Sequence, residues 1–361
     1  MYTIVFLLSL LISIVMENYH SENYFHKDTD SNLRIKKSFF VVVFLSIILY
    51  AALIIAPALR DKVGTDYIVY SNKQIPEVLQ GIPNSVEYLY KGVIHLGNML
   101  GNYQWIFVLT HVIIFLFILM SILRDSKNYW LSIIVLFGTG FFNYSMNIMR
   151  QSIAIAIFLF SIHYLLKREN KKYILCIIIA MLFHKTSILY FMLLVLRNTK
   201  LQWKKIAIFS IGLIIFKEVF RSIMLMISTR FNFYDNQFGT VLDSRQVGWV
   251  FMIANGVILF LYLMINRKKV NSDRTNVYIL LQFIAFAITL ISDVVPNYER
   301  LMYMFMIAQI LSVPYFYKLL NSRVFKWGFL LVLVLVYSLL FYRLFIISNI
   351  GETFPYKSIL N

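Results

Sequence analysis

Apolar runs of about 20 residues recur along this chain, and they limit its folds more than any other feature. A helix needs about 20 mostly apolar residues to cross the hydrocarbon core of a bilayer. With 60% hydrophobic and 14% charged residues, the composition excludes a soluble enzyme or a disordered chain. We predict an all-α polytopic membrane protein with a single transmembrane domain over residues 1–361. The expected spans lie at roughly 2–16, 38–58, 104–123, 129–146, 148–166, 207–228, 248–265, 275–295, 301–320 and 327–348.

The segment 173–196 differs from the other apolar runs because polar residues interrupt its middle. His184-Lys185-Thr186-Ser187 separates two apolar halves, each too short to cross comfortably. Both flanks are strongly basic, and basic flanks prefer the cytoplasm. The sequence therefore predicts a re-entrant helical hairpin that enters from the cytoplasm, with His184 at its tip. Non-helical backbone at that depth is tolerated only inside protein or beside a water-filled cavity.

Placing both ends of the hairpin in the cytoplasm fixes the side of every other loop. The loops then expected inside carry most of the lysines and arginines, so the net charge of +17 reflects membrane topology and not a nucleic-acid partner. We predict a multi-pass protein of the cytoplasmic membrane with both termini outside. The outer loops are expected at 59–103, 143–150, 217–247 and 296–300, and the largest inner loop at 17–37.

Arginine is relatively abundant on the predicted outer side. A guanidinium binds phosphate or carboxylate through two parallel hydrogen bonds, which lysine cannot make. Arg60, Arg150 and Arg300 stand at the outer ends of spans, where a charge close to hydrocarbon points to function. The alternative is snorkelling, or pairing with Asp61, Asp293 or Glu299. The outer arginines are Arg60, Arg150, Arg221, Arg230, Arg245, Arg300 and Arg343.

Two outer segments carry further candidate residues. In the loop after Arg60, Gly64 permits a tight turn and Thr65 or Asp66 can cap a following helix. Tyr67 and Tyr70 are three residues apart and would share a helix face, either to stack on sugar or as part of an aromatic belt. Residues 84–101 have too many polar interruptions to span, and we expect an amphipathic helix on the outer surface.

A second polar group lies between two expected spans. Asn147, Arg150 and Gln151 fall at i, i+3 and i+4, so they are expected on one helix face near a helix N-terminus, which favours an anion. The alternative is polar packing between helices.

Motifs for metal and nucleotide chemistry are missing from the sequence. It has one cysteine, Cys176, no zinc-type Cys/His spacing, no P-loop and no outer acidic pair to hold a metal with a nucleotide diphosphate. We therefore expect no metal and no cofactor.

Four motifs together resemble the EpsG family of Wzy-like bacterial polysaccharide polymerases. They are Arg60 with Val63-Gly64-Thr65-Asp66-Tyr67-x-x-Tyr70, Asn147-x-x-Arg150-Gln151, Ala180-Met181-Leu182-Phe183-His184-Lys185-Thr186-Ser187, and Glu299-Arg300-x-x-Tyr303. The resemblance implies a metal-independent glycosyltransferase that joins oligosaccharide repeat units carried on undecaprenyl diphosphate into exopolysaccharide, capsule or O-antigen. It also implies an outward-facing active site, with a chain-length regulator and a flippase as further partners.

The implied chemistry suggests roles for these residues. Arg150 and Arg300, with Arg60 third, would stabilise the leaving diphosphate, and His184 or Asp66 would act as general base. The alternatives are a hairpin-turn hydrogen bond for His184 and helix capping for Asp66. The remaining substrate-binding candidates are Gly64, Thr65, Tyr67, Tyr70, Asn147, Gln151, Glu299 and Tyr303.

Two other functions stay open at this point. A ligase, or another glycosyl- or acyltransferase using the same lipid carrier, would have a similar donor site. A transporter or flippase would instead show polar residues along several spans around a central cavity, and usually an internal repeat. We find no convincing repeat in the sequence.

Overall fold

The computed structural model describes residues 1–25, 31–231, 238, 243, 247–266 and 272–360. Over these residues the chain is helical, and the one β-type pairing is an isolated bridge between Arg60 and Ser358. Six helical segments in the described part are long and apolar enough to cross a membrane, which confirms the all-α polytopic prediction. They are Tyr2–Tyr19, Phe39–Leu59, Gln104–Asp125, Met149–Leu166, Trp249–Asn266 and Arg323–Ile347.

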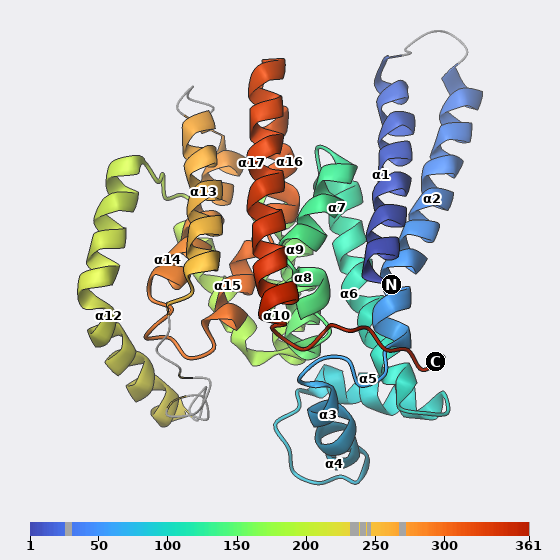
Figure 1. Ribbon diagram of the computed structural model, residues 1–361, viewed down its shortest axis with the longest axis vertical. Helices are drawn as coiled ribbons and strands as arrows, with labels where there is room; N and C mark the ends of the chain where they lie inside the picture. The colour runs from blue at the N-terminus through green and yellow to red at the C-terminus, as the bar shows by residue number, and fades with distance from the viewer. Residues whose placement is uncertain (26–30, 232–237, 239–242, 244–246, 267–271, 361) are drawn as a thin grey trace. The chain divides into compact units, whose positions relative to one another are not determined.

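Contacts divide the chain into two compact units, and we describe each by itself. Unit 1 comprises residues 1–192, 310–318 and 341–361. Figure 1 shows its helices, which are α1 (Tyr2–Phe25), α2 (Ser31–Leu59), α3 (Tyr67–Val69), η1 (Tyr70–Gln74), α4 (Ile75–Leu79), α5 (Tyr88–Met99), α6 (Gln104–Asp125), α7 (Tyr129–Gly138), α8 (Phe141–Tyr144), α9 (Met149–Leu166), α10 (Asn170–Phe183), η2 (Lys185–Phe191), most of α16 (Gln309–Lys318) and η4 (Tyr342–Ile347).

Helix α9 forms the centre of unit 1. Of its span, 72% is buried, against 22% for the span in α2, so α9 lies inside protein whereas α2 exposes most of its apolar surface. Helix α9 packs against α6 and α10. Its fully buried side chains include Ile153, Ile155 and Phe158. This burial fixes the first turn of α9, which carries Arg150.

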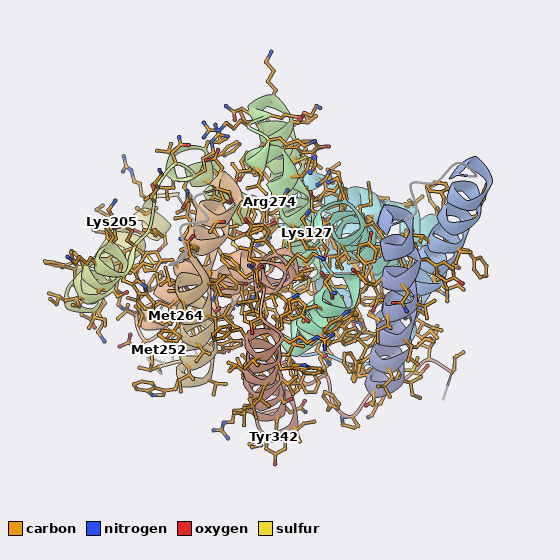
Figure 2. The ribbon with its side chains drawn as sticks, turned by 90° about the horizontal axis from the view of Figure 1, so that it is seen from above. Lys127, Lys205, Met252, Met264, Arg274 and Tyr342 are labelled. Carbon is orange, nitrogen blue, oxygen red and sulfur yellow. The ribbon has the colours of Figure 1, made fainter. Side chains whose placement is uncertain are left out.

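Unit 2 comprises residues 193–309 and 319–340. A buried network of amides joins its helices: Gln282 donates to the side-chain oxygen of Asn255 (3.1 Å), Gln309 donates to Gln282 (2.9 Å), and the Tyr337 hydroxyl donates to Gln309 (2.9 Å). The helices of this unit are α11 (Met192–Leu196), α12 (Trp203–Phe231), α13 (Trp249–Asn266), α14 (Asp273–Leu290), α15 (Tyr298–Met306) and α17 (Arg323–Phe341). Figure 2 shows side chains such as Met252 and Met264 projecting from α13.

Two expected spans are broken, which corrects the prediction of continuous helices at 129–146 and 301–320. The first divides into α7 and α8 because Gly140 adopts a left-handed conformation with φ 76°. The second divides into α15 and α16. Within α16, Pro314 has no N–H to donate to the carbonyl of Ile310. That carbonyl instead accepts a hydrogen bond from the Ser132 hydroxyl at 2.7 Å.

Several loops are also shorter than expected. Helix α12 continues to Phe231, so the predicted outer loop 217–247 begins inside a helix. Arg245 and most of the rest of that loop lie outside the described residues. Likewise α1 runs to Phe25 and α2 begins at Ser31, which reduces the expected inner loop 17–37.

The helical hairpin at 173–196 is present, with its turn at His184. Helix α10 ends at Phe183, and His184 has an extended conformation before the 3₁₀ helix η2. The chain then folds back along α10. A hydrogen bond shows this: the Tyr173 hydroxyl near the start of α10 donates to the carbonyl of Tyr190 in η2 at 2.8 Å. The predicted amphipathic helix is present as α5, which buries Tyr90, Val93 and Ile94.

Candidate functional site

Arg150 lies in the first turn of α9 and forms an ion pair with a glutamate that precedes another helix. Its guanidinium donates to Oε2 of Glu87 and to the carbonyl of Ser85 (3.3 Å). The side chains of Arg150 and Glu87 are 15% and 11% exposed. The pair is therefore mostly buried.

The second oxygen of the same carboxylate contacts the hairpin turn. Oε1 of Glu87 lies 3.1 Å from Nδ1 of His184 and accepts the backbone N–H of Lys185 at 3.3 Å. Arg150 and His184, which the sequence indicated separately, thus meet on one carboxylate. A guanidinium can neutralise an anion here, and an imidazole can accept or donate a proton beside it.

Glu87 is a residue that our sequence analysis did not select. It precedes the expected amphipathic helix, where an acidic residue is ordinarily interpreted as favourable to a helix N-terminus. In the structure its side chain makes no capping bond to α5 and extends to Arg150 and His184 instead. The feature of the sequence that could have indicated Glu87 is an acidic residue in a predicted outer loop, on the same predicted side as the candidate arginines.

The electrostatics of this site keep the glutamate charged. Burial acts to raise the pKa of Glu87, but the hydrogen bond with His184 and the positive charge of Arg150 outweigh it and lower the pKa to about 2. Tyr70 also interacts with the Arg150 guanidinium. Glu87 is therefore an anion throughout the neutral pH range.

Asn147 connects the predicted substrate loop to the C-terminal end of the chain. Its side-chain oxygen accepts hydrogen bonds from the Thr65 hydroxyl (3.2 Å) and the Asp66 N–H (3.3 Å), while its nitrogen donates to the carbonyl of Gly351 (3.0 Å). Helix α9 begins only at Met149, so Asn147 does not share a helix face with Arg150 and Gln151, contrary to our expectation. The turn before α9 directs its amide toward residues 64–66.

Two glycines make room for the Asn147 amide. A Cβ on Gly64 would lie 2.7 Å from the Asn147 oxygen, and a Cβ on Gly351 would lie 2.4 Å from its nitrogen. Both glycines also have positive φ, +103° and +83°, a conformation that costs other residues free energy. Gly64, which we expected to permit a tight turn and to be among the substrate-binding residues, therefore also permits this close approach.

The C-terminal segment 349–360, which we call the C-terminal strap, lies along the loop after α2. The backbone N–H groups of Asp61, Gly64 and Thr65 donate to the carbonyls of Lys357 (3.1 Å), Glu352 (3.1 Å) and Gly351 (3.0 Å). Figure 1 shows the strap, in dark red, passing the N-terminal end of α1, where the Tyr2 hydroxyl donates to the Thr353 carbonyl at 2.9 Å. Our sequence analysis gave this segment no role.

Arg60 is fully buried. Its guanidinium donates to the carbonyls of Val63 and Met146 and lies over the rings of Phe107 and Tyr67, 5.1 and 5.6 Å from their centroids. Burial lowers its pKa to about 10. In this arrangement Arg60 holds the loop and the turn before α9 together, and contact of Arg60 with a substrate stays a prediction.

The other candidates of unit 1 occupy both buried and exposed positions. Tyr67 and Tyr70 are buried, with the Tyr67 ring stacked on Phe107, so neither presents an open ring to solvent. Gln151 is buried and Thr65 is exposed. Asp66 stands before α3 without a side-chain capping bond.

Arg300 and its neighbours belong to unit 2. They lie in the first turns of α15, after Asn297, which has a positive φ of 48°. Burial raises the pKa of Glu299 to about 7, although the charge of Arg300 lowers it in part. Tyr303 is buried with its ring 5.8 Å from that of Phe251. Contact of Arg300 with a ligand stays a prediction.

The described residues contain no group of three or more His, Cys, Asp or Glu side chains placed to hold a metal ion. The candidate site of unit 1 consists instead of one carboxylate with a guanidinium, an imidazole and a backbone N–H around it. This donor set is suited to binding an anion.

Comparison with known proteins gives one match. The model of the EpsG family matches residues 43–358, which include all four motifs of the sequence analysis. No curated protein and no solved structure matches the chain. Since the family model covers nearly the whole sequence, this chain belongs to the EpsG family.

Proposed function

We propose that this protein is a Wzy-like polymerase that joins undecaprenyl-diphosphate-linked oligosaccharide repeat units at the outer face of the cytoplasmic membrane. Membership of the EpsG family supports a polymerase-type role in polysaccharide biosynthesis. The observation that carries the residue assignment is the meeting of Arg150 and His184 on the Glu87 carboxylate. Leaving-group stabilisation and proton transfer are the two tasks that glycosyl transfer from a diphosphate requires.

The reaction exchanges one carbon–oxygen bond for another and transfers one proton. The acceptor hydroxyl oxygen attacks the anomeric carbon of the growing chain, and the bond from that carbon to the diphosphate oxygen breaks. The hydroxyl proton goes to His184, and the electron pair of the broken bond goes to the diphosphate. Arg150 stabilises the charge that develops there, and Arg300 is the second candidate for that role. Asp66 is the second candidate for the proton acceptor.

The direct test supplies purified protein in lipid with one lipid-linked repeat unit as both donor and acceptor. We expect a ladder of lengthening chains from the wild type and none from Arg150→Lys or Arg300→Lys, because lysine keeps the charge but loses the paired donors. Wild-type chain lengths in both variants would contradict the arginine assignment. Single transfer to a different acceptor would indicate a ligase, and movement of the lipid without bond formation a flippase.

The outward orientation needs its own test. Because Cys176 is the only cysteine, a Cys176→Ser background allows single-cysteine labelling of intact cells with an impermeant maleimide. Ser85→Cys, next to the site, should react from outside, and Lys127→Cys, in the loop after α6, should react only after lysis. The reverse pattern would place the site on the cytoplasmic side and contradict the proposal.

A further inference from the structure

Arg150 already has a negative partner, and this bears on how it can bind a diphosphate. Its guanidinium and Glu87 form a mostly buried ion pair. A second anion brought beside Glu87 would be repelled, since like charges in a poorly solvated site disfavour each other strongly. A phosphate can therefore bind Arg150 closely only if the Glu87 side chain leaves.

The surroundings of the Glu87 carboxylate have the form of a phosphate site. Three donors from three elements converge on it: the guanidinium of Arg150 in α9, Nδ1 of His184 after α10, and the N–H of Lys185 in η2. Guanidinium groups and backbone N–H groups are common ligands of phosphate oxygens. These donors now contact the two carboxylate oxygens of Glu87, and they could donate to two phosphate oxygens in the same way.

The carboxylate can leave this position without rearrangement of its helix. Helix α5 is held by Tyr90, Val93 and Ile94, which are buried, and not by the Glu87 side chain, which makes no capping bond. Rotation about the bonds of the glutamate side chain is enough to free the three donors. The low pKa of Glu87, about 2, means that the group that leaves is an anion and competes directly with phosphate.

We propose that Arg150, His184 and the Lys185 N–H form a phosphate-binding site, and that Glu87 is an internal anion displaced by a phosphate group of the lipid-linked diphosphate. The identification of that phosphate rests on the proposed function, whereas the site itself does not. Glu87 compensates the charge of Arg150 close to the membrane when no phosphate is bound. It also returns to expel the diphosphate after transfer, which favours release of the carrier.

The test compares affinities for inorganic diphosphate and for undecaprenyl diphosphate, using the full-length protein in lipid nanodiscs and calorimetry. Glu87→Gln removes the competing charge and should tighten binding of both probes by about tenfold or more, since the binding-competent arrangement no longer has to displace an anion. Glu77→Gln, the same change on α4, is the matched control and should leave both affinities unchanged. The double variant Glu87→Gln/Arg150→Gln should lose the gain.

Unchanged or weaker binding to Glu87→Gln would overturn the proposal and leave Glu87 as a fixed partner of Arg150. If that variant does not fold, Glu87→Asp keeps the charge but withdraws it by one methylene, and it should still bind diphosphate more tightly than the wild type.

Tighter binding without chain elongation would retain this site and contradict the polymerase. Chain elongation by the wild type together with an unchanged diphosphate affinity in Glu87→Gln would support the polymerase and contradict this phosphate site. A gain for inorganic diphosphate alone would assign the site to a free diphosphate and contradict the lipid source.

Discussion

Glu87 forms an ion pair with Arg150 across 63 residues of sequence. The pair joins the amphipathic helix α5 to the first turn of α9, the most buried of the six candidate spans. Because His184 contacts the same carboxylate, the pair also ties both elements to the turn of the helical hairpin.

The Glu87–Arg150 pair should show strong coupling in a double-mutant cycle. Arg150→Ala leaves a largely buried carboxylate without its main partner, and we expect a loss of about 3 kcal/mol in the free energy of unfolding. The double variant with Glu87→Ala should lose clearly less than the sum of the two single variants. Unfolding in detergent measures all three. The exposed pair Lys172–Glu169 is the control, and its cycle should show no measurable coupling; additive effects at Glu87 and Arg150 would contradict the prediction.

Gly64→Ala and Gly351→Ala should destabilise the protein more than alanine at a glycine that also has a positive φ but does not lie against Asn147. Gly81 also has a positive φ, +70°, but a Cβ at that position would meet no atom within 4 Å, so Gly81→Ala should cost only the conformational term of about 1 to 2 kcal/mol. Gly64→Ala and Gly351→Ala add a clash with the Asn147 amide. Thermal unfolding of the three variants compares them directly, and equal losses at all three would refute the close approach.

Stability should depend on pH through Glu299. Its folded pKa of about 7 lies above the reference value of 4.5, so the folded state binds the proton more tightly than the unfolded state. The stabilisation is complete below pH 4.5 and is lost as the pH rises through 7. Glu299→Gln, which stays neutral, should therefore melt higher than the wild type at about pH 8 and at a similar temperature near the reference pKa. A melting difference independent of pH would contradict the raised pKa.

The amide network of unit 2 should be more sensitive at its centre than at its edge. Tyr337→Phe removes one hydrogen bond, to Gln309, and should cost about 1 kcal/mol. Gln309→Leu leaves the Tyr337 hydroxyl and the Gln282 oxygen without this buried partner and should cost more, about 1 to 3 kcal/mol. Chemical unfolding in detergent distinguishes the two. A larger loss for Tyr337→Phe would mean that the network does not depend on Gln309 in the way its geometry indicates.

The sequence alone determined the all-α membrane architecture and the turn at His184. Both follow from local properties: an apolar run must bury its surface in lipid or protein, and two apolar halves that are each too short to cross are expected to fold back at the polar residues between them. Helix breaks were harder to predict, because Gly140 lies within a run whose hydropathy continues past it, and the break at 307–308 carries neither glycine nor proline.

Only the tertiary structure decided how the candidate residues are partnered. Nothing near Glu87 in sequence indicates that its carboxylate reaches Arg150 and His184, and nothing near Gly351 indicates that it must make room for Asn147. Nor does the sequence around Arg60 show that its guanidinium is enclosed by carbonyls and rings. The physical reason is the range of the forces involved: hydropathy acts residue by residue along a segment, whereas a buried charge takes its partner from whatever distant segment packing brings within a few ångströms.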